Sequence, residues 1–343
     1  MIAGILIILL KIAFMLGLIL NLAGLLTWVE RKQSALMQDR IGPNRANLGS
    51  YTVIGLLHPL ADVVKLIMKE NFVPARGNRI VHTLAPFIAL FPALVTYAVI
   101  PFGEYTVGDR QVPLVVADLD VGILYIFAFA SLGVYGVMLA GWGSYNSYSL
   151  LGGMRAASQM ISYEVAMGLA ALGVLMVYGS VEMDEIVQRQ GNLLWGILLQ
   201  PVGFILFLGA SIAETRRAPF DLPEGESEIM GYFIEYSGMK FGTFFLAEFA
   251  DVVVASALLT TLFFGGWQIP FLPVEWFHSF WGTILQVLTF VFKVAFFCWF
   301  LLLIRWTFPR FRYDQLMRLG WKYMVPLALA NVFVTGFIIL ILQ

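Results

Sequence analysis

The sequence predicts an all-α polytopic membrane protein with about eight transmembrane helices, long charged cytoplasmic loops and one amphipathic interfacial helix. Of its 343 residues, 60% are hydrophobic and only 13% are charged. The mean hydropathy of +0.83 is far above that of a soluble domain. Apolar stretches long enough to span a bilayer recur along the chain. No repeat, low-complexity segment or linker interrupts them, so residues 1–343 are expected to form one helical membrane domain.

The apolar stretches define the expected spans. They lie at about 2–28, 83–102, 120–141, 160–179, 194–213, 241–264, 282–304 and 322–342. The first is long enough to span and has no small-residue cleavage site, so we expect a membrane helix and not a removed signal peptide.

The basic residues predict the orientation of these spans. Most of the 21 lysines and arginines fall in connections at about 29–82, 142–159, 214–240 and 305–321. By the positive-inside rule these connections are cytoplasmic loops, and both termini face away from the cytoplasm.

The first of these loops contains a candidate interfacial helix at 52–70. Asp62, Lys65 and Lys69 share one helical face, opposite an apolar face. With so many charges the segment is expected to lie at the membrane surface or against a partner and not to span. A solvated charge stripe is the alternative.

The chain itself shows no redox centre. A single cysteine, Cys298, excludes an iron–sulfur cluster held within the chain, and the three histidines are not paired at metal-ligand spacing. A net charge of −1 argues against binding nucleic acid through a broad basic surface. No phosphate-binding loop, dinucleotide fingerprint or nucleophile elbow is present.

Acidic residues within the apolar stretches are the main candidates for function. Glu164, Glu248 and Asp251 lie at membrane depth, where a charge costs roughly 3 kcal/mol or more. Glu214 ends the fifth span, and three more glutamates follow it closely. Clustered carboxylates raise one another's pKa, as a proton relay requires. For each single acid, a structural hydrogen bond or ion pair is the alternative. Lys293 is a candidate counter-ion.

Several motifs resemble one family. AETRRAPFDLPEGESE at 213–228 resembles the signature loop of the membrane subunit, called H or 1, that joins the two arms of respiratory complex I, the proton-pumping NADH:quinone oxidoreductase. Further motifs of that family follow in the right order over nearly the whole chain: ERKQSALMQDRIGPNR, GWGSYNSYSLLGGMRAASQMISYEV, EYSGMKFGTFFLAEF, LFFGGWQ and RWTFPRFRYDQLMRLGWK.

The resemblance implies a subunit of a bacterial inner (plasma) membrane complex that is not catalytic as an isolated chain. It implies a cavity through which the substrate, ubiquinone or menaquinone, reaches the peripheral arm, and the start of a carboxylate proton path. Flavin and iron–sulfur clusters are expected on partner subunits. The implied partners are the quinone-reducing peripheral-arm subunits and the adjacent small and antiporter-like membrane subunits.

The resemblance also implies roles for individual residues. The proton path would use Glu164, Glu214, Glu224, Glu226, Glu228, Glu235 and Glu248. The quinone cavity or its entrance would use Arg31, Gln33, Arg40, Asp62, Lys65, Arg216, Arg217 and Phe220. The arginines could stabilise the negative charge that forms when the quinone is reduced. The family often has asparagine at the position of Arg216 and histidine at that of Phe233, so the loop is expected to differ in detail.

Three alternatives remain at this point. The chain could be the homologous anchoring subunit of a ferredoxin-linked or hydrogenase-type complex. It could be a cation/proton transporter, although the inverted repeats of that class are not visible. It could also be a passive membrane anchor, in which the acids serve assembly alone.

Overall fold

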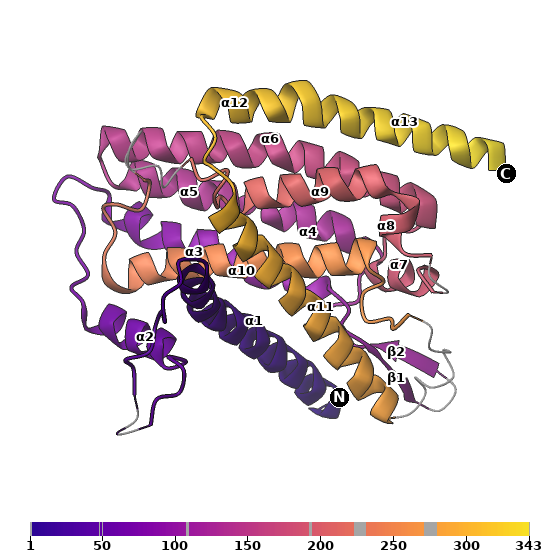
Figure 1. The fold of residues 1–343 in the computed structure, drawn as a ribbon, viewed down its shortest axis with the longest axis horizontal. Helices are drawn as coiled ribbons and strands as arrows, with labels where there is room; N and C mark the ends of the chain where they lie inside the picture. The colour runs from indigo at the N-terminus through magenta and orange to yellow at the C-terminus, as the bar shows by residue number, and fades with distance from the viewer. Residues whose placement is uncertain are drawn as a thin grey trace.

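The computed structural model describes residues 2–47, 49, 51–107, 110–191, 194–222, 231–270 and 280–342. Over this part of the chain the all-α expectation is confirmed, because only one antiparallel hairpin, β1 (Glu104–Val107) and β2 (Arg110–Pro113), interrupts the helices. Figure 1 shows long helices that lie side by side, with α1 and α11 crossing the others obliquely.

The long helices are α1 (Ile2–Met37), α3 (Arg79–Thr96), α5 (Leu132–Gly143), α6 (Ser147–Tyr178), α9 (Pro201–Glu214), α10 (Gly238–Phe263), α11 (Phe280–Thr307) and α13 (Val325–Leu342). The shorter ones are α2 (His58–Met68), α4 (Gly122–Ala130), α7 (Met183–Arg189), α8 (Gly196–Leu199) and α12 (Tyr313–Arg318). A 3-10 turn (Tyr97–Val99) extends α3, and a π-helical turn (Leu319–Met324) joins α12 to α13.

Within the described residues, seven helical segments are long and apolar enough to cross a membrane. The expected fifth span at 194–213 is instead divided into α8 and α9. Pro201 has no backbone N–H and restricts the preceding residue, and Gln200 is accordingly non-helical, with φ −133° and ψ 60°. With 14 residues, α9 is about 21 Å long, which is shorter than a membrane core.

Helix ends depend on local hydrogen bonds and extend beyond the apolar stretches. The Asn146 side chain accepts a hydrogen bond from the Tyr148 N–H and starts α6 at Ser147. The loop expected at 142–159 is therefore helical for most of its length. Similarly, α1 continues to Met37, so Arg31 and Gln33 lie on a helix and not in a loop.

The core forms around α10, whose residues from Val252 to Phe263 are all buried. Close approach of neighbouring helices depends on small residues. Gly136 of α5 faces Ala89 of α3, and a Cβ at position 136 would lie 2.5 Å from the Ala89 nitrogen. The two helices can pack at this distance only because glycine has no side chain.

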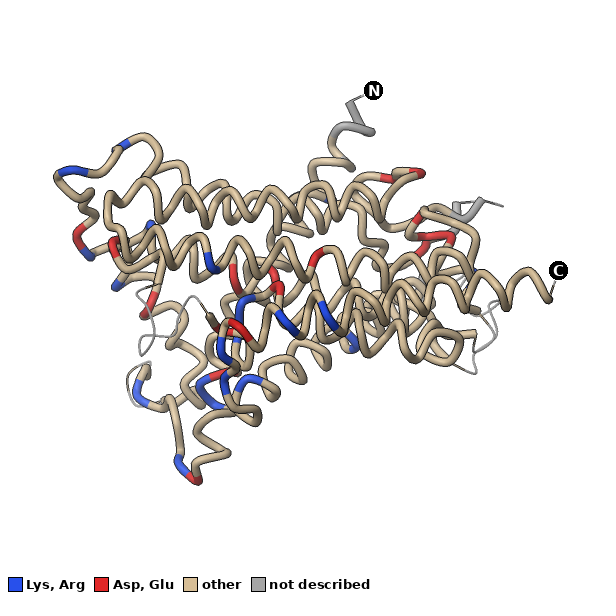
Figure 2. Tube along the Cα trace, turned by 90° about the horizontal axis from the view of Figure 1, so that it is seen from above, with Lys and Arg blue, Asp and Glu red and all other residues tan. Residues whose placement is uncertain are grey.

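Charge is distributed unevenly along the bundle. In Figure 2, lysines and arginines gather on the left half of the molecule, whereas most charged residues at the right end are acidic. Chain termini and the hairpin lie away from the basic end. This arrangement agrees with the orientation expected from the positive-inside rule.

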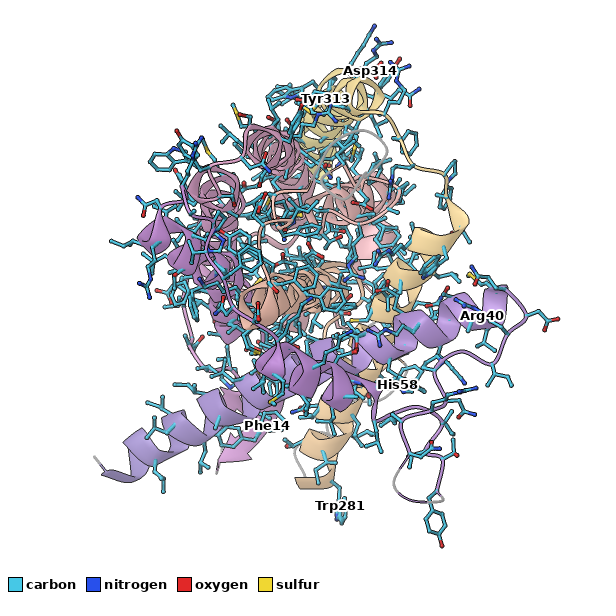
Figure 3. All side chains as sticks on the ribbon, turned by 90° about the vertical axis from the view of Figure 1, so that its left-hand side faces the viewer. Phe14, Arg40, His58, Trp281, Tyr313 and Asp314 are labelled. Atoms are coloured by element: carbon cyan, nitrogen blue, oxygen red, sulfur yellow. The ribbon has the colours of Figure 1, made fainter. Side chains whose placement is uncertain are left out.

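The expected interfacial helix is α2, which packs beside α1 near His58 (Figure 3). None of its residues is buried, and its apolar side chains Leu60, Val64 and Ile67 are exposed. A position at the membrane surface would cover this apolar face.

Candidate functional site: an ion network beside an internal cavity

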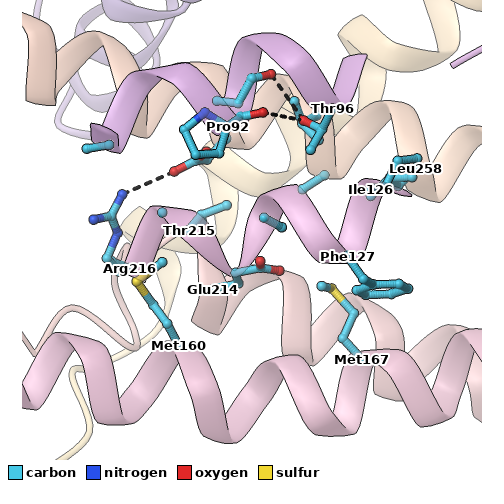
Figure 4. A pocket seen from close by; sticks show the side chains of 17 residues that line it. Pro92, Thr96, Ile126, Phe127, Met160, Met167, Glu214, Thr215, Arg216 and Leu258 are labelled. Atoms are coloured by element: carbon cyan, nitrogen blue, oxygen red, sulfur yellow. Dashed lines mark hydrogen bonds and ion pairs between the residues drawn. The ribbon is translucent and has the colours of Figure 1, made fainter. Parts of the chain in front are cut away.

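A cavity of about 50 Å³, large enough for a few waters, lies inside the bundle where α9 ends. Its wall is mostly apolar and comes from α3, α4, α6 and α10. Glu214, Thr215, Arg216 and Asp251 are its hydrophilic end. Figure 4 shows Glu214 and Arg216 near Met160 of α6, with Thr96 and Phe127 farther along the cavity. Three of these polar groups come from the last residue of α9 and the turn that follows it.

Arg216 connects the polar groups of this cavity. Its guanidinium is buried and donates hydrogen bonds to the Asp251 carboxylate and to the Tyr232 hydroxyl, each at 3.1 Å. Tyr232 in turn donates to the Glu248 carboxylate at 3.1 Å. The two acids of α10 are thus linked through one arginine and one tyrosine. Such pairing is what permits charges to be buried at this depth.

Glu164 and Glu214 complete the network. Glu164 of α6 and Asp251 of α10 both lie close enough to interact electrostatically with the Glu214 carboxylate. The structure therefore brings together four of the acids expected from the sequence: Glu164, Glu214, Glu248 and Asp251. Glu224, Glu226 and Glu228 lie outside the described residues.

Gln159 of α6 holds the turn after α9 in place. Its side-chain amide donates to the carbonyls of Ala213 and Phe220, each at 2.7 Å. Phe220 is buried and stacks on Phe311, with ring centroids 5.5 Å apart. Sequence reasoning missed both Gln159 and Tyr232, because their importance depends on contacts between segments distant in sequence.

Glu235 lies apart from this network. Its carboxylate accepts a hydrogen bond from the Asn146 side chain at 2.8 Å, and its backbone carbonyl lies 3.3 Å from the His82 ring. His82 is buried and stacks on Tyr236 with centroids 3.9 Å apart. The structure thus places Glu235 where α3 and the start of α6 meet.

A second buried ion cluster joins α1, the turn after α9, and α11. The Glu30 carboxylate accepts from Arg217 at 2.7 Å and also from Arg305. The Arg217 guanidinium lies 3.9 Å from the centroid of the Phe249 ring, within cation–π distance. Glu30 was not among the expected site residues. Glu30 lies directly before Arg31 and Lys32 in the sequence, and nothing in this charged segment indicated that the Glu30 side chain would be buried.

The remaining expected cavity residues lie along α1 and α2. Arg31 and Asp62 form an ion pair at 2.6 Å that ties these helices together. Gln33 is buried, and neither atom of its side-chain amide has a hydrogen-bond partner among the described residues. Arg40 and Lys65 are exposed.

Lys293 has a local role at the far end of α10. Its ammonium donates to the carbonyls of Phe264, Gly266 and Gln268 at 2.6 to 3.0 Å. It also lies 4.9 Å from the centroid of the Trp195 ring. The cation binds carbonyls of the C-cap residue and of the turn that follows α10.

Comparison with known proteins agrees with this architecture. The family model described as NADH dehydrogenase matches residues 10–336. The chain is 49% identical to the first of the NADH-quinone oxidoreductase H subunits of Cytophaga hutchinsonii, over 92% of this chain and 91% of that protein. It is 47% identical to subunit 8 of the enzyme of the same name from Rhodothermus marinus, over 94% of both chains. It is also 47% identical to the second of the H subunits of Syntrophobacter fumaroxidans, over 97% and 96% of the two chains.

These matches cover nearly the whole chain, including the turn that carries Arg216 and the α10 residue Asp251 that it binds. The resemblance stated from the motifs is confirmed, and this chain belongs to the NADH dehydrogenase family, among the H subunits of NADH-quinone oxidoreductase.

Proposed function

We propose that this chain is the membrane subunit of a proton-pumping NADH-quinone oxidoreductase, at its junction with the peripheral arm, where it couples quinone reduction to proton translocation. The observation that carries the proposal is the network around Arg216. It links the turn after α9 to Asp251 and, through Tyr232, to Glu248 beside the internal cavity. A change of charge or conformation at that turn would alter the electrostatic environment of acids inside the membrane.

The quinone cavity is proposed at the basic end, between α1, α2 and the turn after α9. A quinone site needs an apolar entrance for the tail and polar groups for the head. The exposed apolar face of α2 supports the presence of an entrance for the tail. The buried amide of Gln33, which has no partner among the described residues, supports the presence of a polar group for the head. Arg217, held by Glu30, would contribute positive charge nearby. Ubiquinone and menaquinone both fit this chemistry.

The redox cofactors are proposed to lie on partner chains. In this arrangement flavin and iron–sulfur clusters belong to the peripheral arm, and the small and antiporter-like membrane subunits lie beside this chain in the bacterial inner membrane. Its own residues would hold and transfer protons: Glu214 at the turn, then Glu164 and the α10 acids. The segment 223–230 and Glu235 would provide the route from the cytoplasm.

Glu214→Gln in the assembled complex tests the proposal. We expect NADH-to-quinone electron transfer and proton pumping to fall at least tenfold, with electron transfer to an artificial acceptor retained. Glu70→Gln, which removes a charge from an exposed position, is the matched control and should retain both activities. Parental activity in Glu214→Gln, with assembly verified, would contradict the proposal. A complex that accepts electrons from reduced ferredoxin but not from NADH would instead indicate the related anchoring subunit.

A further inference from the structure

A second, smaller polar cavity lies at the opposite end of the bundle. It has a volume of about 10 Å³, close to the room that a single water needs, and lies where α7 begins, beside the connection from the hairpin to α4. Three acids line it: Asp118, Glu182 and Asp184. This end carries few basic residues and is expected to face the outer compartment. The proton path proposed above does not use any of these acids.

Asp184 is the buried member of this group. The residue is 7% exposed, and its Oδ2 accepts a hydrogen bond from the Gln188 amide at 2.8 Å. Its Oδ1 is buried and has no hydrogen-bond partner among the described residues, although the residue lines the cavity. A buried carboxylate oxygen without a donor is costly, whereas a protonated carboxyl can donate to a water in the cavity.

The same amide holds a second carboxyl. Gln188 Nε2 also donates to Oε1 of Glu104 on β1 at 2.7 Å. Glu104 is 7% exposed, so two buried carboxyl groups share one amide nitrogen. The negative charge of Glu104 disfavours ionisation of Asp184, and a proton on Asp184 relieves the repulsion.

The charged groups around this pair reinforce the effect. Asp120 and Glu185 add negative charge beside Glu182. The Arg189 guanidinium is bound to Glu185 and to the Tyr178 carbonyl, and Lys11 of α1 donates to the carbonyl of Val115. Within the described part of the chain, neither cation forms an ion pair with Asp184. Burial, followed by the charges of Glu104, Glu182 and Asp118, raises the pKa of Asp184 to about 7.

An apolar layer separates this cavity from the inner one. Val99 and Met183 line the outer cavity, and both pack against Gly122, where a Cβ would lie 2.8 and 3.0 Å from their side chains. The inner cavity ends at Thr96 and Ile126, which are about one helical turn away. The close packing at Gly122 would therefore separate a water in the outer cavity from the Glu214 network.

We propose that Asp184, paired with Glu104 through Gln188, is a proton-binding site that exchanges with the outer compartment. Deprotonation places a second charge beside Glu104 in a buried position and loosens the contact between α7 and the hairpin. The ligand is a proton delivered by outer water. This inference is independent of the coupling function proposed for Glu214.

Proton binding by Asp184 is linked to the stability of the folded protein, which sets the direction of the pH effect. The pKa of Asp184 is higher in the folded protein than the ordinary value of 3.8, so the proton stabilises the folded state. This stability is complete below pH about 4, falls as pH rises, and levels off above about 7. Over that range local opening of α7 should increase, by up to about tenfold per pH unit.

The test is infrared spectroscopy of the assembled complex in sealed vesicles without turnover, titrating each side separately. We expect a protonated-carboxyl band with a midpoint near pH 7 that responds to outer pH and is lost in Asp184→Asn. Glu185→Gln, which removes the nearby solvent-accessible acid, should retain the band. If Asp184→Asn does not assemble, Gln188→Leu is the second test. It removes the hydrogen-bond donor to Asp184, so the titration midpoint of the carboxyl band should move to higher pH.

Three results would overturn the proposal: no such band in the parent, a midpoint below pH 5, or a response to inner pH. Because no turnover is measured, these results are independent of the outcome for Glu214→Gln.

Discussion

At the scale of single residues, Arg216 is the group on which the inner network depends. Its side chain is 3% exposed and serves both Asp251 and Tyr232. Removing one member of a buried pair leaves the other charge uncompensated, at a cost of roughly 3–5 kcal/mol. We therefore expect Arg216→Ala to lower the thermal stability of the assembled complex and to abolish coupling.

Arg216→Lys makes this prediction specific. Lysine keeps the positive charge but lacks the planar guanidinium that donates from separate nitrogens. We therefore expect the lysine to keep the ion pair with Asp251 and to lose the hydrogen bond to Tyr232. Stability should return in part, while pumping stays below the parental level. As a control, Arg312→Ala breaks an exposed pair with Asp314 and should change stability by less than about 1 kcal/mol. Equal effects of Arg216→Ala and Arg312→Ala would refute the role of Arg216.

The acids that lie together beside the inner cavity were expected from the sequence, whereas two of the residues that hold this region together were not. A carboxylate within an apolar stretch is rare enough to be noticed, which is why Glu164, Glu214, Glu248 and Asp251 were all expected. The groups that organise them, Gln159 and Tyr232, are ordinary residues in sequence. Their importance arises only when α6 and α10 approach the turn after α9, and periodicity carries no information about that approach.

At the scale of elements, hydropathy predicted which segments enter the membrane but not where helices end. Apolar length measures burial in lipid, whereas a helix end depends on a cap such as Asn146 or on a proline such as Pro201. The division of the fifth span was visible in the sequence as a proline after Gln200. The apolar residues on both sides of it outweighed that signal.

The break at Gln200 is held by α13. The Gln200 amide donates to the Thr335 hydroxyl at 2.8 Å and accepts from the Asn331 side chain at 2.9 Å. Thr335→Val removes the acceptor, so we expect α13 to detach more easily, at a cost of about 0.6–1.7 kcal/mol. Hydrogen exchange of α13 in detergent measures the effect.

Thr289→Val provides the matched control for this substitution. The Thr289 side chain is half-buried, and among the described residues its hydroxyl bonds only to the Leu285 carbonyl of its own helix. Exchange of α13 should therefore stay at the parental rate in this variant. A comparable increase in both variants would mean that the loss of any hydroxyl loosens the bundle, and that the Gln200 contact has no special role.

At the scale of the whole molecule, the two cavities lie toward opposite ends of the bundle and differ in charge balance. The inner cavity contains Arg216 among its acids, and further arginines lie close by, at 217 and 305. The outer cavity has three acids in its lining, and Lys11 and Arg189 are bound to other groups. This asymmetry matches the positive-inside rule, and it makes the orientation of the protein a physical prediction.

Single cysteines test that orientation, because native Cys298 is 1% exposed and should not react in the folded protein. Asn47→Cys and Ala75→Cys lie at the basic end, and Asp120→Cys lies at the acidic end; all three positions are exposed. A membrane-impermeant maleimide should label the first two in inside-out vesicles and the third in spheroplasts. The parental chain is the blank, and labelling after detergent treatment verifies that each cysteine can react. The reverse pattern would place Glu214 on the outer side, and the outer-facing assignment of Asp184 would fail with it.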